Sequence, residues 1–173
     1  MPILSAGVFT GVVPFTSTDG WTVCALGHRH WGRAGAAGLF LHRDGADGAE
    51  VLLQHRASWS HHGDTWGTPG GALHAAESPE QGALREAREE LGLLPDDVVL
   101  GPRTVDDHGG WAYTTVLARP ARSLEPADLR LDGESNGVAW VALRRFGEVP
   151  LHPGLAASLP RLEALLREVG ADL

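Results

Sequence analysis

The fold follows from one stretch of the chain, residues 70–93, which reads GGALHAAESPEQGALREAREELGL. The stretch predicts a helix, because Ser78 suits the N-cap, Pro79 suits the first helical position, and Gln81 completes a capping-box pattern. Gly92 is the expected stop, since glycine adopts the left-handed conformation that ends many helices. We therefore expect a helix that begins at Pro79 and ends just before Gly92, after a glycine-rich turn.

Carboxylates gather on one flank of this predicted helix. At about 100° per residue, its apolar face consists of Ala83, Leu84, Ala87 and Leu91. A neighbouring flank holds Glu86, Glu89 and Glu90. Like charges three or four residues apart destabilise an isolated helix by about 0.2–0.5 kcal/mol per pair, so the cluster calls for a cation. The alternative interpretation is a solvated face in which Arg85 pairs with Glu89.

The spacing around the helix resembles the Nudix box of the Nudix hydrolase superfamily. The pattern reads Gly71-x5-Glu77-x7-Arg85-Glu86-x-x-Glu89-Glu90-x-Gly92-Leu93. All of its fixed residues are present over residues 71–93, and one aliphatic position holds the small Ala87. At ordinary residue frequencies a chance match in this chain is on the order of one in a million. The resemblance implies a Nudix fold of the α/β (α+β) class, with a mixed sheet sandwiched by helices.

The family pattern also implies roles for single residues. The expected metal, Mg²⁺ or Mn²⁺, prefers oxygen ligands, and the implied ligands are the Gly70 carbonyl, Glu86, Glu89 and Glu90. The implied catalytic residues are Glu86, Arg85 and Glu89, with Glu86 as the general base in many members and Arg85 holding the glutamates in place. Gly71, Glu77 and Gly92 complete the structural part of the box, in which Glu77 would tie the loop to the helix. The number of metal ions and the source of the base stay open.

Three residues outside the box are candidates for substrate contact. His152 follows the predicted strand at Trp140, in a region where nucleotide-cleaving relatives place base-recognition residues. Glu134 lies just before that strand, where some relatives supply a further carboxylate to the metals, although an exposed turn explains it equally well. His62 lies in the long loop before Trp66 and could contact phosphate or nucleobase, or face solvent.

The resemblance implies hydrolysis of a nucleoside diphosphate linked to another moiety. The proline that marks the ADP-ribose subgroup is absent near His108, and Tyr113 lies three or four positions late for the diadenosine-polyphosphate subgroup. By elimination, the first choice is a MutT-like nucleoside triphosphate pyrophosphatase. An ADP-ribose, nucleotide-sugar or coenzyme A-type pyrophosphatase is an alternative, because residues 52–56 partly match the coenzyme A pattern. A non-catalytic nucleotide-binding module is another, which the retained box glutamates disfavour.

Composition limits the partners. The 173 residues carry 22 carboxylates against 14 basic side chains, all of them Arg, for a net charge of −8. Such an acidic chain does not favour a nucleic-acid polymer but suits a small nucleotide whose charge a divalent cation neutralises. We see no targeting or membrane-spanning pattern and expect a cytoplasmic protein with no membrane partner. A homodimer is open.

The remaining pattern predicts short strands and one more helix. Residues 1–30 form an N-terminal extension, predicted as a β-hairpin of Gly7–Phe15 and Trp21–Leu26, ahead of a Nudix domain over residues 31–173. Further strands are expected at 37–41, 50–54, 98–107, 111–118 and 137–143, and a last helix at 155–169 that Pro160 begins or kinks.

Histidines suggest two further clusters. His28-x-His30 and His61-His62 invite a metal interpretation, but no cysteine or acidic partner occurs at zinc-site spacing, so we do not expect a structural zinc. The loop from Asp106 to His108 is a second candidate functional loop, for which an ordinary turn is the favoured interpretation.

Overall fold

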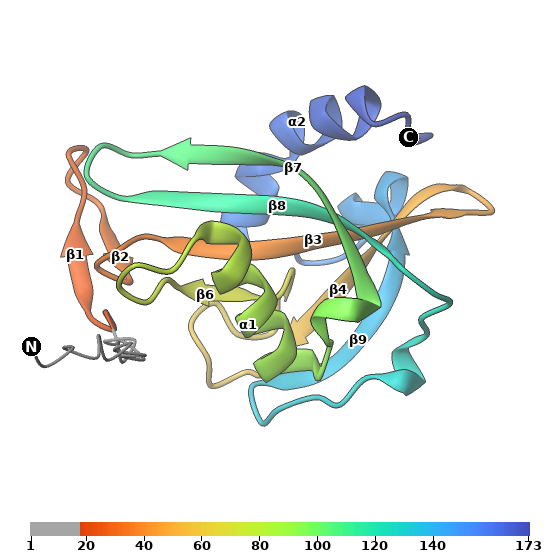
Figure 1. The fold of residues 1–173 in the computed structure, drawn as a ribbon, viewed down its shortest axis with the longest axis horizontal. Coiled ribbons are helices and arrows are strands. Elements are labelled where there is room, and N and C mark those ends of the chain that lie inside the picture. The colour runs from red at the N-terminus through yellow and green to blue at the C-terminus, as the bar shows by residue number, and fades with distance from the viewer. Residues whose placement is uncertain (1–17) are drawn as a thin grey trace, which may run out of the picture.

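A mixed sheet forms the centre of the molecule (Figure 1). The computed structural model describes residues 18–173, so the strand expected at Gly7–Phe15 lies outside the described residues. The main sheet has the order β5-β4-β3-β8-β7, with β6 also paired to β3 and β9 to β4. Its strands are β3 (Ala36–Gly45), β4 (Gly48–Arg56), β5 (Trp66–Gly67), β6 (Gly70–Ala72), β7 (Val98–Asp107), β8 (Ala112–Pro120) and β9 (Ser135–Ala142). The β3–β8 pairing is parallel and the other pairings are antiparallel.

Two helices cover opposite faces of this sheet (Figure 1). They are α1 (Pro79–Leu91) and α2 (Pro153–Glu168). Successive strand residues point to opposite faces, so Leu39 and Leu41 of β3 pack in the core with α1, whereas Phe40 between them packs with α2. Short 3-10 helices occupy Pro95–Asp97, Pro126–Asp128 and Leu143–Glu148. The expected class, a mixed sheet sandwiched by helices, is confirmed.

Helix α1 begins and ends where the sequence predicts. The Ser78 side chain accepts a hydrogen bond from the Gln81 N–H, and the Gln81 side chain accepts one from the Ser78 N–H. Gly92 ends the helix with a φ of 68°. In α2, Pro160 lies inside the helix, which already begins at Pro153, so Pro160 does not start it.

A small hairpin stands beside one end of the main sheet. It pairs β1 (Trp21–Val23) with β2 (Arg29–Trp31) in antiparallel register. The strand expected at Trp21–Leu26 therefore ends at Val23, and it pairs with Arg29–Trp31, where no strand was expected. The turn of this hairpin lies at residues 24–28, because the chain must reverse there for the two strands to pair. Figure 1 places the hairpin next to the loop that joins β7 to β8, and a backbone hydrogen bond from Ala25 to the Gly109 carbonyl links the two.

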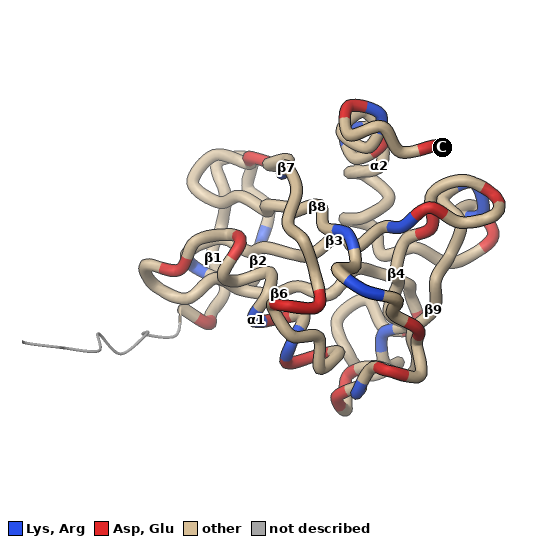
Figure 2. Tube along the Cα trace, turned by 45° about the vertical axis from the view of Figure 1, so that its right-hand side comes forward, with Lys and Arg blue, Asp and Glu red and all other residues tan. Residues whose placement is uncertain are grey.

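Charged residues of both signs are spread over the described trace (Figure 2). Several of them form ion pairs at the surface, such as Arg119 with Asp44 and Arg103 with Glu80. Among the described helices, none is both long and apolar enough to cross a membrane.

Candidate active site

Two glycines pack against the charged flank of α1. The sequence predicts a turn at Gly70 and Gly71, but the structure places both in the strand β6, which pairs with Gly38 and Ala37 of β3. A Cβ atom on Gly71 would lie 2.6 Å from the Glu86 carboxylate, closer than nonbonded atoms can approach. A Cβ on Gly70 would lie equally close to the Ala37 carbonyl oxygen. Glycine at both positions therefore lets the strand backbone approach the helix carboxylates.

Arg85 connects the strand β6, the loop that contains Glu77, and the helix α1. Its guanidinium donates to both carboxylate oxygens of Glu77, at 2.9 and 3.0 Å, and to Glu86 at 2.7 Å. It also donates to Glu89 at 3.2 Å and to the Ala72 carbonyl at 2.7 Å. A planar fork of five N–H donors suits several carboxylates at once, which the point charge of a lysine does not. Through these hydrogen bonds, Arg85 connects the carboxylates of α1 to Glu77 and to the strand β6.

Glu77 is the buried anchor of this network. Its side chain is 5% exposed, and Oε2 also accepts a hydrogen bond from the His74 N–H. Burial alone would raise the pKa of Glu77, but the hydrogen bonds from Arg85 and from the His74 backbone lower it below its ordinary value. Glu77 is thus held as a carboxylate that connects the loop to the helix.

The three glutamates of the flank differ strongly in burial. Glu90 is only 8% exposed, accepts a hydrogen bond from the Gly70 N–H at 3.1 Å, and has its pKa raised to about 8 by burial and by the charge of Glu86. Burial also raises the pKa of Glu86, against the opposing effect of Arg85. Glu89 is 58% exposed. One carboxylate lies deep, one lies at intermediate depth, and one reaches solvent.

This donor set fits a hard divalent cation. A buried carboxylate beside a second carboxylate is costly unless a positive charge lies close to it. Arg85 bonds Glu86 and Glu89, whereas the hydrogen bond given for Glu90 comes from the backbone of Gly70. Carboxylate and carbonyl oxygens are the ligands that Mg²⁺ and Mn²⁺ prefer. The residues present therefore match such an ion in both chemistry and charge.

A second group of polar side chains adjoins the carboxylates through Arg56, which ends β4. The Arg56 charge lowers the pKa of Glu90 and also the pKa values of His62 and His152, so it acts on both groups. Arg56 Nε donates to the His61 carbonyl at 3.1 Å. The His62 and His152 rings lie 4.8 Å apart, edge to face. The structure therefore brings together the candidates His62 and His152 from segments 90 residues apart in the sequence.

His152 is a neutral, fixed ring. Its Nδ1 accepts a hydrogen bond from the Gly154 N–H at the start of α2, so the neutral ring carries its proton on Nε2. Burial, followed by the charges of His62 and Arg56, lowers the pKa of His152 to about 4. At neutral pH this side chain offers a hydrogen-bond donor without a charge.

Glu134 is exposed, in the loop before β9. In the same loop, the charge of Asp132 raises the pKa of Glu90. Asp132 accepts hydrogen bonds from the Glu134 N–H and the Ser135 hydroxyl, and its own N–H donates to the Glu90 carbonyl. The structure thus connects Asp132 to the residue Glu90 through the backbone, a position that the sequence pattern did not single out.

Two more residues at the site escaped the sequence pattern. Arg56 was considered only as part of a coenzyme A motif. Tyr113 was considered only as a subgroup marker, yet its hydroxyl lies where a Cβ atom on Gly70 would be 2.6 Å away. Burial, followed by the charges of Glu90 and Glu86, raises the pKa of Tyr113. One feature of the sequence could have indicated them. Both residues lie near the end of an apolar segment that was expected to form a strand, Arg56 at the end of β4 and Tyr113 near the start of β8.

Two curated proteins resemble this chain over most of its length. A 46% identical Mycobacterium tuberculosis protein (strain CDC 1551 / Oshkosh), whose name proposes an 8-oxo-dGTP diphosphatase, matches over 83% of this chain and 68% of its own length. A Bifidobacterium longum protein (strain NCC 2705), named as a nucleoside triphosphate pyrophosphatase/Nudix hydrolase fusion protein, is 43% identical over 87% of this chain. This chain spans only 32% of that fusion protein.

A solved structure and a family model point to the same family. The crystal structure of a Nudix hydrolase from M. smegmatis superposes with a TM-score of 0.79 at 41% identity, covering 87% of this chain and 96% of its own. The model of the NUDIX domain matches residues 32–162, which include the glycine turn, the carboxylate helix and His152. Nudix hydrolases generally use divalent metals. The chain therefore belongs to the NUDIX domain family, the Nudix hydrolases.

Proposed function

We propose that this protein is a Mg²⁺-dependent pyrophosphohydrolase that cleaves nucleoside triphosphates in the manner of MutT-like enzymes. The observation that carries the proposal is the set of three glutamates on α1, graded from buried to exposed beside the two glycines of β6. Arg85 holds Glu86 and Glu89, and the Gly70 N–H donates to Glu90. The proposed ligands are Glu86, Glu89, Glu90 and the Gly70 carbonyl. Mg²⁺ is proposed over Mn²⁺ as the working ion, and Mn²⁺ should support activity through the same oxygens.

The reaction needs charge neutralisation and an oriented water molecule. The bound cation would offset the charge that develops on the diphosphate oxygens. The attacking water forms a new P–O bond, the bridging P–O bond breaks, and the products are a nucleoside monophosphate and pyrophosphate. We assign Glu86 as the base that takes the proton of the water, since Arg85 occupies Oε1 of Glu86 and burial raises the pKa of this carboxylate. Arg85 positions both Glu86 and Glu89.

The adjoining group supplies substrate contacts. Arg56 is proposed to hold the phosphates, because its charge already acts on Glu90 and on both histidines beside it. The neutral His152 and its neighbour His62 are proposed to contact the nucleobase or sugar, because these parts of a nucleotide are uncharged and can be bound by a neutral hydrogen-bonding group. Glu134 is proposed as a minor contact from the opposite loop. The name of the Bifidobacterium longum relative favours a nucleoside triphosphate as the substrate, and the name of the Mycobacterium tuberculosis relative favours 8-oxo-dGTP among these.

We also propose that residues 31–173 form the catalytic domain and residues 1–30 an extension to it. The family match from residue 32 onward supports this boundary. The β1–β2 hairpin lies across the boundary, since β2 ends at Trp31.

A substrate panel tests the proposed function. Purified protein with millimolar Mg²⁺ is offered dGTP, 8-oxo-dGTP, ADP-ribose, coenzyme A and a diadenosine polyphosphate, and the products are separated by ion-exchange chromatography. The expected result is a monophosphate and pyrophosphate from a triphosphate, with the highest kcat/KM on the panel. Cleavage of ADP-ribose or coenzyme A in preference would overturn the MutT-like assignment. Tight nucleotide binding without turnover would identify a non-catalytic module instead.

A further inference from the structure

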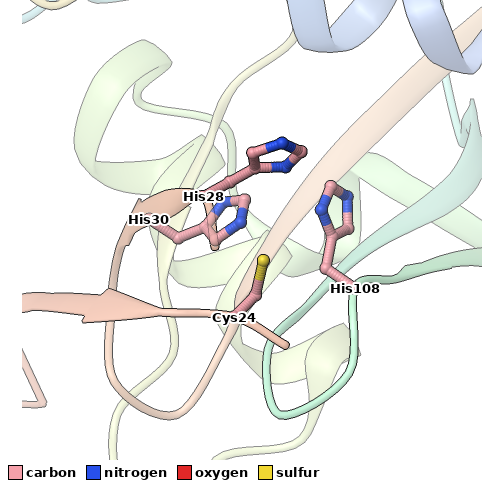
Figure 3. Close-up of side chains that lie close together, drawn as sticks. All are labelled: Cys24, His28, His30 and His108. Carbon is pink, nitrogen blue, oxygen red and sulfur yellow. The ribbon is translucent and has the colours of Figure 1, made fainter. Parts of the chain in front are cut away.

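Four potential metal ligands converge away from the glutamate site. Figure 3 shows Cys24, His28, His30 and His108 pointing toward one another between the β1–β2 hairpin and the β7–β8 loop. Each offers one ligand atom, and all four atoms lie within 4.8 Å of one another. In a tetrahedral zinc site with bonds of about 2.0–2.3 Å, ligand atoms are separated by about 3.3–3.8 Å, so small side-chain rotations complete the geometry.

The hairpin register places three of the four ligands on one face. Thr22 is opposite His30 in the β1–β2 pair, and Cys24 follows Thr22 by two residues, as His28 precedes His30 by two. Side chains two residues apart in a strand share a face. The Cys24 N–H donates to the His28 carbonyl at 3.0 Å, which continues the hairpin pairing to the turn.

The β7–β8 loop brings the fourth ligand to this face. Ala25 N–H donates to the Gly109 carbonyl at 2.8 Å, and the His108 N–H donates to the Trp111 carbonyl at 2.9 Å. Gly109 has a φ of 72°, and a Cβ atom there would lie 2.7 Å from the Cβ of Ala25. The loop is therefore shaped to lie directly against the hairpin turn, with His108 beside the other three ligands.

Two ring nitrogens in the cluster are buried without a partner. They are His30 Nε2 and His108 Nδ1, which are among four such side-chain atoms in the described part of the chain. A buried polar atom without a partner costs about 1–3 kcal/mol. The three imidazole rings lie at centroid distances of 4.8 to 6.4 Å from one another. A cation that accepts the nitrogen lone pairs would satisfy both buried atoms.

We propose that Cys24, His28, His30 and His108 bind a structural Zn²⁺ ion that fastens the N-terminal hairpin to the β7–β8 loop. Three imidazole nitrogens and one thiolate are the ligand types of structural zinc sites, and four protein ligands leave no open position for catalysis. Binding displaces the thiol proton of Cys24 to solvent. This revises the expectation from chain spacing, because His108 is 78 residues beyond His30 and only the fold brings it near.

The residues around His108 hold its ring in the orientation that a metal ligand needs. Its Nε2 lies 3.3 Å from Asp106 Oδ2, which leaves Nδ1 directed into the cluster. Asp106 is in turn paired with Arg161 of α2 at 3.0 Å. A carboxylate that orients a metal-bound histidine is the usual second layer of zinc sites. On the other side, the His30 ring stacks on Trp111 at 3.9 Å, which fixes the plane of that ligand.

The test uses the full chain, purified without a polyhistidine tag and dialysed against metal-free buffer after addition of ZnCl₂. Elemental analysis should find one tightly held zinc per chain. Replacement by Co²⁺ should give a thiolate-to-cobalt charge-transfer band, which reports on this site alone because Cys24 is the only cysteine. Cys24→Ser should abolish the band, and His108→Ala should lower zinc affinity. Asp106→Asn should weaken binding by about 10–100-fold.

Control variants separate this site from others. His61→Ala removes an exposed histidine of the other histidine cluster and should leave zinc content unchanged. The double variant Glu89→Gln, Glu90→Gln should keep the charge-transfer band. Zinc content that persists in the Cys24→Ser and His108→Ala variants would place the metal elsewhere and overturn the proposal. Failure of the wild-type protein to retain zinc or to form the cobalt band would do the same.

Discussion

Replacing Glu90 by Gln should have opposite effects on activity and on the stability of the metal-free protein. The change keeps the size of the side chain and an oxygen that can accept from the Gly70 N–H, but it removes the charge from a residue that is 8% exposed. Loss of a proposed metal ligand should lower kcat by about 10²–10³-fold, as other electrostatic losses in active sites do. Loss of a buried charge should stabilise the fold when no cation is present.

The size of the stabilisation follows from the pKa of Glu90. Burial raises it from 4.5 to about 8. Because the folded pKa is above the unfolded one, the stability that Glu90 contributes is fully present below pH 4.5 and is lost as the pH rises toward 8. At pH 7 the loss of stability is set by the interval from pH 4.5 to pH 7, which corresponds to about 3 kcal/mol at 1.36 kcal/mol per pH unit. The metal-free Gln variant should therefore exceed wild type by up to about 3 kcal/mol at pH 7, and the difference should vanish near pH 4.

Urea unfolding in EDTA at several pH values measures this difference, and steady-state kinetics measure the activity. Mg²⁺ at 100 times its Kd should add about 2.7 kcal/mol to the wild type and much less to the variant. Glu80→Gln is the matched control on the same helix, since Glu80 pairs with Arg103 away from the glycine turn, and it should keep wild-type activity. Full activity in the Glu90 variant, or a metal-free variant less stable than wild type at pH 7, would refute the reasoning.

Three further changes test other parts of the site. Gly71→Ala places a Cβ atom 2.6 Å from the Glu86 carboxylate and should lower kcat by about 100-fold through misplacement of that group, so an unchanged kcat would contradict the assigned close approach. Arg85→Met leaves the buried carboxylate of Glu77 without its positively charged partner, with only the His74 N–H as a donor, and should cost about 3 kcal/mol in urea unfolding, whereas a neutral effect would argue against the anchoring role. Arg56→Gln should raise KM for the triphosphate more than it lowers kcat, and the same change at the exposed Arg88 should alter neither; equal KM values in the two variants would remove Arg56 from the phosphate site.

Helix α1 was predictable almost to the residue because its ends depend on local interactions. The capping box of Ser78 and Gln81 and the left-handed Gly92 each involve residues within five positions of one another. Strands were expected in the regions of β3, β4, β7, β8 and β9, whereas the short strands β5 and β6 just before α1 were expected as a loop and a turn. Their two or three residues take extended pairing only because β3 and β4 lie beside them. The family followed from the spacing of charged residues on this one helix.

Burial within the glutamate flank was not predictable from the helix alone. A helical wheel places Glu86, Glu89 and Glu90 together, but only the glycine strand packed over the helix makes Glu90 buried and leaves Glu89 exposed. The role of Arg56 was not predictable for a similar reason. Arg56 ends β4, and only the folded sheet brings its charge close enough to lower the pKa of Glu90.

The sequence by itself determined the helix, most of the long strand segments, the family and the identity of the carboxylates proposed to hold the metal. These depend on spacing along the chain, which capping, side-chain periodicity and motif patterns report directly. The tertiary structure alone decided which carboxylate is buried, that His62 meets His152, and that His108 joins Cys24, His28 and His30. Those features depend on contacts between segments far apart in the chain. Burial by such contacts raises the pKa of Glu90, and the packing of the β7–β8 loop against the hairpin brings His108 to the other three proposed zinc ligands.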